Sequence, residues 1–213
     1  MSSHTAMRHT VQMDEQAWDA RYETSERIWS GRPNGALTVE AADLSPGQAL
    51  DVGCGEGGDA LWLADRGWHV TAVDISRVAL NRGAAHDDAA RISWKQGDLT
   101  SSGPPARSFD LVNVQYFPLL KQREKAARRL IDTVAVGGTL LYVGHDLSDF
   151  DPNDHDHDWD GPDPREYFMP AEIAALLDDN WQIEVNETRP RVDVPEASAH
   201  FHNDLVLRAR RTD

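Results

Sequence analysis

The sequence has little cysteine, little positive charge and no long apolar run, and each shortage argues against a class of protein. Cys54 is the single cysteine among 213 residues, so an internal disulfide is excluded and a reducing, cytoplasmic compartment is expected. Only 21 lysines and arginines stand against 36 aspartates and glutamates, and the net charge of −15 disfavours nucleic acids and anionic membranes as partners. We find neither a membrane-spanning run nor the apolar core of a signal peptide.

Apolar segments alternate with helical patterns from residue 46 onward, and we expect one domain there. The strand patterns cover residues 49–52, 69–73, 92–96, 109–114 and 139–143. The helical patterns between them cover residues 59–66, 77–85 and 121–134, the last with an apolar inner face formed by Ala127, Leu130, Ile131 and Val134. Nearly continuous apolar strands separated by helices indicate a parallel sheet covered on both faces.

Both ends of the chain depart from this alternation. Residues 1–45 are predicted to form a helical N-terminal extension, with a loose tail to about residue 12 and a helix over 16–28. The segment DFDPNDHDHDWDGPDP, residues 149–164, is predicted to be an acidic loop within the domain 46–213. A helix over 170–178 and two strands, over 181–185 and about 200–208, are expected to close the chain.

The stretch DVGCGEGGD, residues 51–59, follows the first strand and contains closely spaced glycines. These fit both the G-x-G-x-x-G turn of dinucleotide-binding proteins and a G-x-G-x-G turn, and a tight turn without a ligand is a third interpretation. Asp74, at the end of the second strand, can accept hydrogen bonds from a ribose in either ligand-binding case. Asp51 favours one of them: a carboxylate beside a diphosphate is unfavourable, whereas it suits the amino group and sulfonium of S-adenosylmethionine.

Five motifs in order then resemble one family. LDVGCGEGG, VTAVDIS, QGDL, FDLVNVQYF and VGGTLLYV are similar to the consecutive motifs of class I S-adenosylmethionine-dependent methyltransferases. Within that family the layout resembles small-molecule enzymes of the tellurite-resistance (TehB-like) and thiopurine types, on the evidence of the N-terminal WDARYETSERIWSGRPN. The resemblance implies a Rossmann-like α/β fold: a seven-stranded, mostly parallel sheet with helices on both faces and an antiparallel last strand.

The resemblance also implies a set of cofactor-binding residues. Asp51 would hold the amino group of the cofactor, Asp74 with Ile75 its ribose, and Asp98 with Leu99 its adenine. The remaining members are the glycines that would line the methionine part, a residue of the fourth strand and a residue of the segment 29–34 that would fold over the cofactor: Gly53, Gly55, Gly57, Asn113 and Trp29.

The methyl acceptor is expected beyond the carboxyl ends of the fourth and fifth strands, where ligands bind in open α/β sheets. Gln115 and Tyr116 follow the fourth strand and His145 follows the fifth. His145 is the first candidate for a general base, and Tyr116 and Tyr22 are further candidate catalytic residues. Ordinary capping or packing explains each of them equally well. The acceptor is a small molecule with a thiol, hydroxyl, amine or metalloid centre.

Several alternatives remain open. A cofactor-binding module without catalysis and an NAD-dependent oxidoreductase are the competing functions, and the chain could be a monomer or a homodimer. We expect no metal site, although His155 and His157 in the acidic loop are weak candidate ligands and would gain support if His200 and His202 faced the same cleft. Nucleic-acid methylation is further disfavoured because NVQY replaces the N/D-P-P-Y/F tetrad after the fourth strand.

Overall fold

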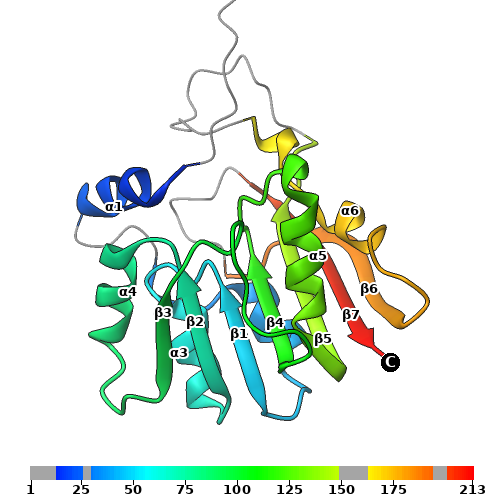
Figure 1. Cartoon of the computed structure of the whole chain (residues 1–213), viewed down its shortest axis with the longest axis horizontal. Helices are drawn as coiled ribbons and strands as arrows, with labels where there is room; N and C mark the ends of the chain where they lie inside the picture. Colours follow the sequence, from blue (N-terminus) through cyan, green and yellow to red (C-terminus); the bar gives the residue numbers. More distant parts are fainter. Residues whose placement is uncertain (1–12, 26–29, 149–162, 194–200) are drawn as a thin grey trace, which may run out of the picture.

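The computed structural model describes residues 13–25, 30–148, 163–193 and 201–213. Within them seven strands form one sheet in the order β3-β2-β1-β4-β5-β7-β6 (Figure 1). The strands are β1 (Gln48–Val52), β2 (His69–Asp74), β3 (Ile92–Gln96), β4 (Phe109–Gln115), β5 (Val134–His145), β6 (Trp181–Pro190) and β7 (Asn203–Arg211). β7 runs antiparallel to both of its neighbours, and β1 to β5 pair in parallel, so the expected sheet is confirmed.

Helices cover both faces of this sheet (Figure 1). They are α1 (Glu15–Glu23), α2 (Gly35–Glu40), α3 (Gly58–Asp65), α4 (Arg77–Ala84), α5 (Glu124–Asp132) and α6 (Pro170–Ala174), with 3-10 turns η1 (Lys121–Arg123) and η2 (Pro164–Glu166). Buried side chains of α5 and α6 join one apolar core on the sheet, and those of α2 and α3 join a second core on its other face. No described helix has the length and apolar character needed to cross a membrane.

The predicted helix over 121–134 is wrong at both ends. Residues 121–123 form the 3-10 turn η1, and α5 stops at Asp132 because the Thr133 hydroxyl and amide both donate to the Leu130 carbonyl. Val134 is buried, but it pairs with Phe109 as the first residue of β5 rather than lying on a helix face. Its apolar character fits either element, and the long-range pairing decides between them.

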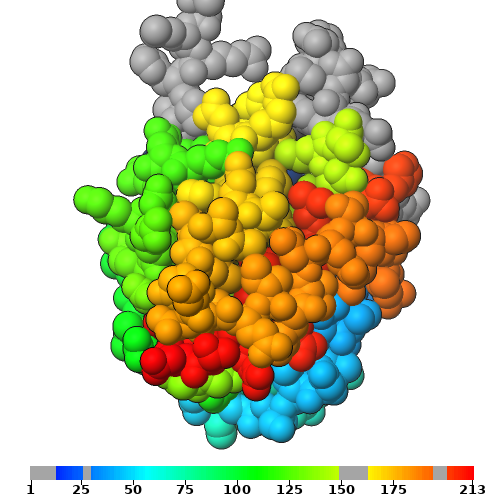
Figure 2. All heavy atoms as spheres, turned by 90° about the vertical axis from the view of Figure 1, so that its right-hand side faces the viewer, coloured from blue at the N-terminus to red at the C-terminus, as the bar shows by residue number. Residues whose placement is uncertain are grey.

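The edge strand β6 is more exposed than the central strands, and together with α6 it forms the face shown in Figure 2. Its side chains carry charge: Glu184 pairs with Arg208 and Arg210, and Arg189 pairs with Glu40. Charged side chains on an edge strand discourage pairing with a second sheet.

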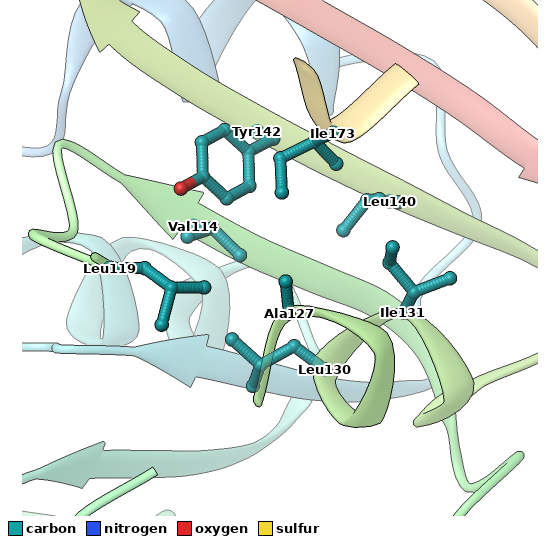
Figure 3. A pocket seen from close by; sticks show the side chains of 8 residues that line it. All are labelled: Val114, Leu119, Ala127, Leu130, Ile131, Leu140, Tyr142 and Ile173. Atoms are coloured by element: carbon teal, nitrogen blue, oxygen red, sulfur yellow. The ribbon is translucent and has the colours of Figure 1, made fainter. Parts of the chain in front are cut away.

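A small apolar cavity lies between β4, β5, α5 and α6 (Figure 3). Ile173 of α6 reaches into it and is 1% exposed. We expect Ile173→Val to lower the free energy of unfolding by about 0.5–1.5 kcal/mol, because it enlarges an existing void. The matched control is Ile183→Val on β6, where the side chain is 46% exposed and the same change should have an effect below about 0.5 kcal/mol. Urea denaturation of both variants tests this, and equal effects would contradict it.

Candidate cofactor and acceptor site

The glycine turn joins β1 to α3 through backbone conformations that favour glycine. Gly53 and Gly57 have φ values of +65° and +82°. A Cβ atom would lie 2.6 Å from Phe117 Cδ2 at the first position and 2.4 Å from Trp94 Cη2 at the second. Both positions therefore exclude a side chain by conformation and by space. The turn brings the carboxyl end of β1 next to the N-terminus of α3, the arrangement that suits a bound ligand.

Asp74, the last residue of β2, is tied to this turn. Its Oδ2 accepts a hydrogen bond from the Gly55 amide at 2.9 Å, and its Oδ1 accepts one from the Ser76 amide at 2.8 Å. Burial raises the pKa of the Asp74 carboxyl above its ordinary value. Because each carboxylate oxygen has a second lone pair, the group can still accept hydrogen bonds from two ligand hydroxyls.

Asp51 and Asp59 share one amide. Asn113 Nδ2 donates to Asp51 Oδ1 at 2.9 Å and to Asp59 Oδ2 at 3.1 Å. Asp59 also accepts hydrogen bonds from the backbone amide and the side chain of Asn34, which precedes α2. Sequence reasoning did not select Asp59 as a site residue, although it is the last letter of DVGCGEGGD. It included Asn34 only as the end of the segment 29–34 that was expected to fold over the cofactor. The sequence feature that could have identified Asp59 is its position in the first turn of the predicted helix, directly after the glycines.

The second oxygen of Asp51 is the most informative atom of the site. Asp51 is 2% exposed, and its Oδ2 is buried with no hydrogen bond of good geometry among the described residues, although the nearby Ala60 amide favours its charged form. Burial, reinforced by the charge of Asp59, raises the pKa of Asp51 well above its ordinary value, and burial also raises the pKa of Asp59. An incoming cationic donor would relieve this concentration of negative charge.

Cys54, inside the turn, is affected by the same carboxylates. Burial, with the nearby Asp51 and Asp74, raises the pKa of its thiol well above the ordinary value. A thiol held neutral in this way is a poor nucleophile, which agrees with a small side chain tolerated in a crowded loop.

The predicted adenine-side residues lie at the ends of β2 and β3. Asp98 Oδ1 accepts hydrogen bonds from the amide and hydroxyl of Thr100, so this carboxylate caps its own turn. Leu99 is 5% exposed and packs in the core beneath α5, while Ile75 is half-buried. Their contacts with adenine and ribose stay predictions.

The N-terminal helix docks beside this end of the sheet. Helix α1 lies beside α4 (Figure 1). Asp19 of α1 accepts hydrogen bonds from the Ser76 hydroxyl and the Val78 amide at the start of α4. Glu15 accepts a hydrogen bond from Gln96 at the end of β3. Tyr22, a candidate catalytic residue, is 3% exposed on the same helix.

The candidate acceptor side forms a second polar cluster at the ends of β4 and β5. The ring of His145 is stacked between the rings of Tyr116 and Phe201, with ring centroids 4.1 Å and 4.0 Å apart, respectively. Tyr116 has a φ of +53° and donates from its hydroxyl to Asp204 Oδ1 at 2.8 Å. Asp204 also pairs with Arg191 at 3.0 Å. Sequence reasoning missed Asp204 and Arg191, since nothing local marks them.

Some candidates fall outside the part of the chain that the structure describes. These are Trp29, His155, His157 and His200, together with most of the acidic loop. The end of that loop is described: Asp163 accepts a hydrogen bond from the Arg165 amide and caps η2. His202 is exposed.

Comparison with known proteins supports the interpretation of the glycine turn. A family model described as "Methyltransferase domain" matches residues 49–138. Ajmaline N-methyltransferase of Rauvolfia serpentina is 28% identical over 119 residues, covering 53% of this chain and 40% of that protein. An uncharacterized methyltransferase of Mycobacterium tuberculosis is 38% identical over 109 residues, covering 51% and 55%. The matched stretch therefore spans about half the length of these curated relatives or less.

The fold agrees with the sequence matches. TehB from Haemophilus influenzae superposes with a TM-score of 0.63 and 18% identity, over 92% of this chain and 66% of that one. At this identity the likeness concerns the fold alone. It includes the segments before and after the matched region, in accord with the TehB-like layout expected from the N-terminal sequence. Residues 49–138 are therefore similar to the methyltransferase domain family, and the chain shares the fold of TehB.

Proposed function

We propose that this protein binds S-adenosylmethionine at the carboxyl ends of β1, β2 and β4 and transfers its methyl group to a small-molecule acceptor. The observation that carries the proposal is the buried, unpartnered Oδ2 of Asp51 beside the carboxylate of Asp59. A dinucleotide would bring its diphosphate to these charges, whereas an ammonium group and a sulfonium complement them. The same argument disfavours an NAD-dependent oxidoreductase.

Each residue of the site is proposed to bind a different part of the cofactor. Asp51 Oδ2 accepts from the cofactor's ammonium group, Asp74 accepts from its ribose hydroxyls, and the glycine turn lets the backbone approach. Asp98 and Leu99 would face the adenine. The bound cofactor supplies an electrophilic methyl group on its sulfonium. Since displacement at that methyl group is in line, positioning of the acceptor provides much of the catalysis.

The N-terminal extension, residues 1–45, is proposed to cover this site. The contacts of Asp19 with the start of α4 and of Asn34 with Asp59 support it, because both join the extension to the edge where the cofactor would lie. A reducing, cytoplasmic setting fits the single cysteine, and a monomer or a homodimer is compatible with the charged edge strand β6.

Calorimetric titration with S-adenosylhomocysteine and with NADH tests the proposal. We expect the first to bind and the second not to bind. Because the pKa values of Asp51, Asp59 and Asp74 are raised in the ligand-free fold, these groups hold protons at pH values where ordinary carboxyls have lost them. The ammonium group of S-adenosylhomocysteine needs the charged carboxylates, so affinity should rise with pH above the ordinary value of 3.8, with protons released on binding.

The same raised pKa values affect the stability of the ligand-free protein in the opposite direction as pH rises. The unfolded chain loses these protons near the ordinary pKa, so the contribution of Asp51, Asp59 and Asp74 to the stability of the ligand-free protein should fall as pH rises from there to the raised pKa values. Carboxyls whose pKa values are lowered, such as Asp87 and Asp98, contribute in the opposite direction. NADH binding, or S-adenosylhomocysteine affinity that falls as pH rises through this window, would contradict the proposal. Binding of S-adenosylhomocysteine with no turnover of any thiol, phenol, amine or metalloid oxyanion would instead favour a module that binds the cofactor without catalysis.

A further inference from the structure

Gln115, the last residue of β4, carries a second buried acceptor that the cofactor contacts above do not use. The residue is 9% exposed, and its Oε1 has no hydrogen-bond partner among the described residues. Its Nε2 donates to Asn113 Oδ1 at 2.7 Å. An orphaned amide oxygen inside a protein costs free energy unless a ligand satisfies it.

The orientation of this amide is fixed by a relay that starts at the carboxylates. Asn113 presents its NH2 group to Asp51 Oδ1 and Asp59 Oδ2, because carboxylates that face a cationic cofactor are ionised and then only accept hydrogen bonds. Its Oδ1 then faces Gln115, which must present its own NH2 group in return. The Gln115 carbonyl therefore points away from Asn113 and can only accept hydrogen bonds. Rotating the Gln115 amide by 180° would place its oxygen against Asn113 Oδ1, and rotating the Asn113 amide would place two NH2 groups together.

The position of Gln115 is on the acceptor side of the site. Asp51 and Asn113 are register partners on β1 and β4, and the last pair of this ladder is Val52 with Val114. Gln115 lies one residue beyond that pair, where β1 has already turned away at Gly53. On its other side, on β5, it pairs with Val143, two residues before His145. It therefore stands between the Asp51 carboxylate and the Tyr116–His145 ring stack.

The charges around this point discriminate between classes of nucleophile. Asp51 and Asp59 are negative once a cationic cofactor is bound. Two arginines near this edge are already ion-paired, Arg191 with Asp204 and Arg82 with Glu56. A thiolate or a carboxylate placed against the Gln115 carbonyl would meet repulsion. A hydroxyl could donate to it, but an amide oxygen cannot remove the proton that a hydroxyl must lose. A neutral amine donates an N–H and keeps its lone pair.

We propose that Gln115 Oε1 accepts the N–H of a primary or secondary amine and that such an amine is the methyl acceptor, an inference that rests on the proposed function. The nitrogen lone pair forms the N–CH3 bond as the methyl–sulfur bond breaks, and the sulfur leaves with the bonding electrons as neutral S-adenosylhomocysteine. The nitrogen takes up the positive charge and retains its proton as an ammonium product. This step needs no general base, so the proposal gives His145 a packing role between the rings of Tyr116 and Phe201.

The test compares Gln115→Met with Gln182→Met, the same change at an exposed glutamine on β6. Each protein is given S-adenosylmethionine and a panel of primary and secondary amines of increasing size. Each amine is compared with the thiol and the alcohol of the same carbon skeleton, and the smallest set is benzylamine, benzyl mercaptan and benzyl alcohol. S-adenosylhomocysteine formation is measured. We expect wild type to methylate amines, with a rate that rises with pH as the amine loses its proton. Gln115→Met should lower kcat/KM for the amine about tenfold, leaving S-adenosylhomocysteine affinity and the control unchanged.

Three outcomes overturn the inference. Thiols methylated in preference to amines would overturn it while leaving methyl transfer intact. Amine turnover by Gln115→Met within twofold of wild type would do the same, provided that S-adenosylhomocysteine still binds. If wild type binds S-adenosylhomocysteine but methylates no member of the panel, the inference and the proposed catalysis both fail.

Discussion

Replacing Asp51 with asparagine is expected to weaken S-adenosylhomocysteine binding about 100-fold or more while making the ligand-free protein more stable. The variant keeps the shape of the side chain and an oxygen for the Asn113 amide. It removes the charge that would face the ligand's ammonium group, and breaking a buried charge pair by removing one partner costs about 3–5 kcal/mol. In the ligand-free protein the same change relieves a buried carboxylate that has Asp59 beside it and an unpartnered oxygen.

Calorimetry and thermal unfolding of Asp51→Asn measure the two effects separately. The matched control is Asp179→Asn, at an exposed aspartate that should change neither quantity. Methylthioadenosine provides a second comparison, because it has the ribose and adenine of the ligand but no amino group. Its affinity should be nearly the same in wild type and Asp51→Asn. Equal losses for the two ligands would show that the change disturbs the fold rather than the ammonium contact.

Replacing Asp74 with alanine should weaken S-adenosylhomocysteine and methylthioadenosine alike, each about 100-fold or more. The carboxylate is expected to accept hydrogen bonds from two ribose hydroxyls, and hydrogen bonds to a charged group contribute about 1.5–3 kcal/mol each. The change also frees the Gly55 and Ser76 amides that Asp74 holds, so the glycine turn loses its tie to β2.

Asp74→Asn separates these two causes. It preserves the size of the side chain and one acceptor oxygen, and we expect affinity between those of wild type and Asp74→Ala. Asp88→Ala, at an exposed aspartate, is the control for removal of a carboxylate. Retention of wild-type affinity for methylthioadenosine by Asp74→Ala would place the ribose elsewhere and refute the assignment.

The sequence by itself determined the sheet and its cofactor edge, because those features are written in short stretches of chain. Strand β3 was predicted with its observed bounds, and the helix predicted over 77–85 matches α4 to within one residue. The glycine turn could be predicted because a tight turn after a buried strand requires glycine. Asp74 was proposed as a ligand-binding residue because it ends the neighbouring strand at the same edge of the sheet. Asp51 was identified by its charge alone.

Only the tertiary structure decided which polar groups share that edge. Asn113 bonds with Asp51 and Asp59 across 62 and 54 residues of chain, and Tyr116 bonds with Asp204 across 88. No local pattern encodes such pairs, since a buried hydrogen bond depends on the register of distant strands and on which face each side chain takes. For the same reason the sequence shows Gln115 only as a polar residue at a strand end. The direction of its carbonyl follows from its hydrogen bond to Asn113, which only the structure shows. Residue types were local information, whereas the partners that give them chemistry were not.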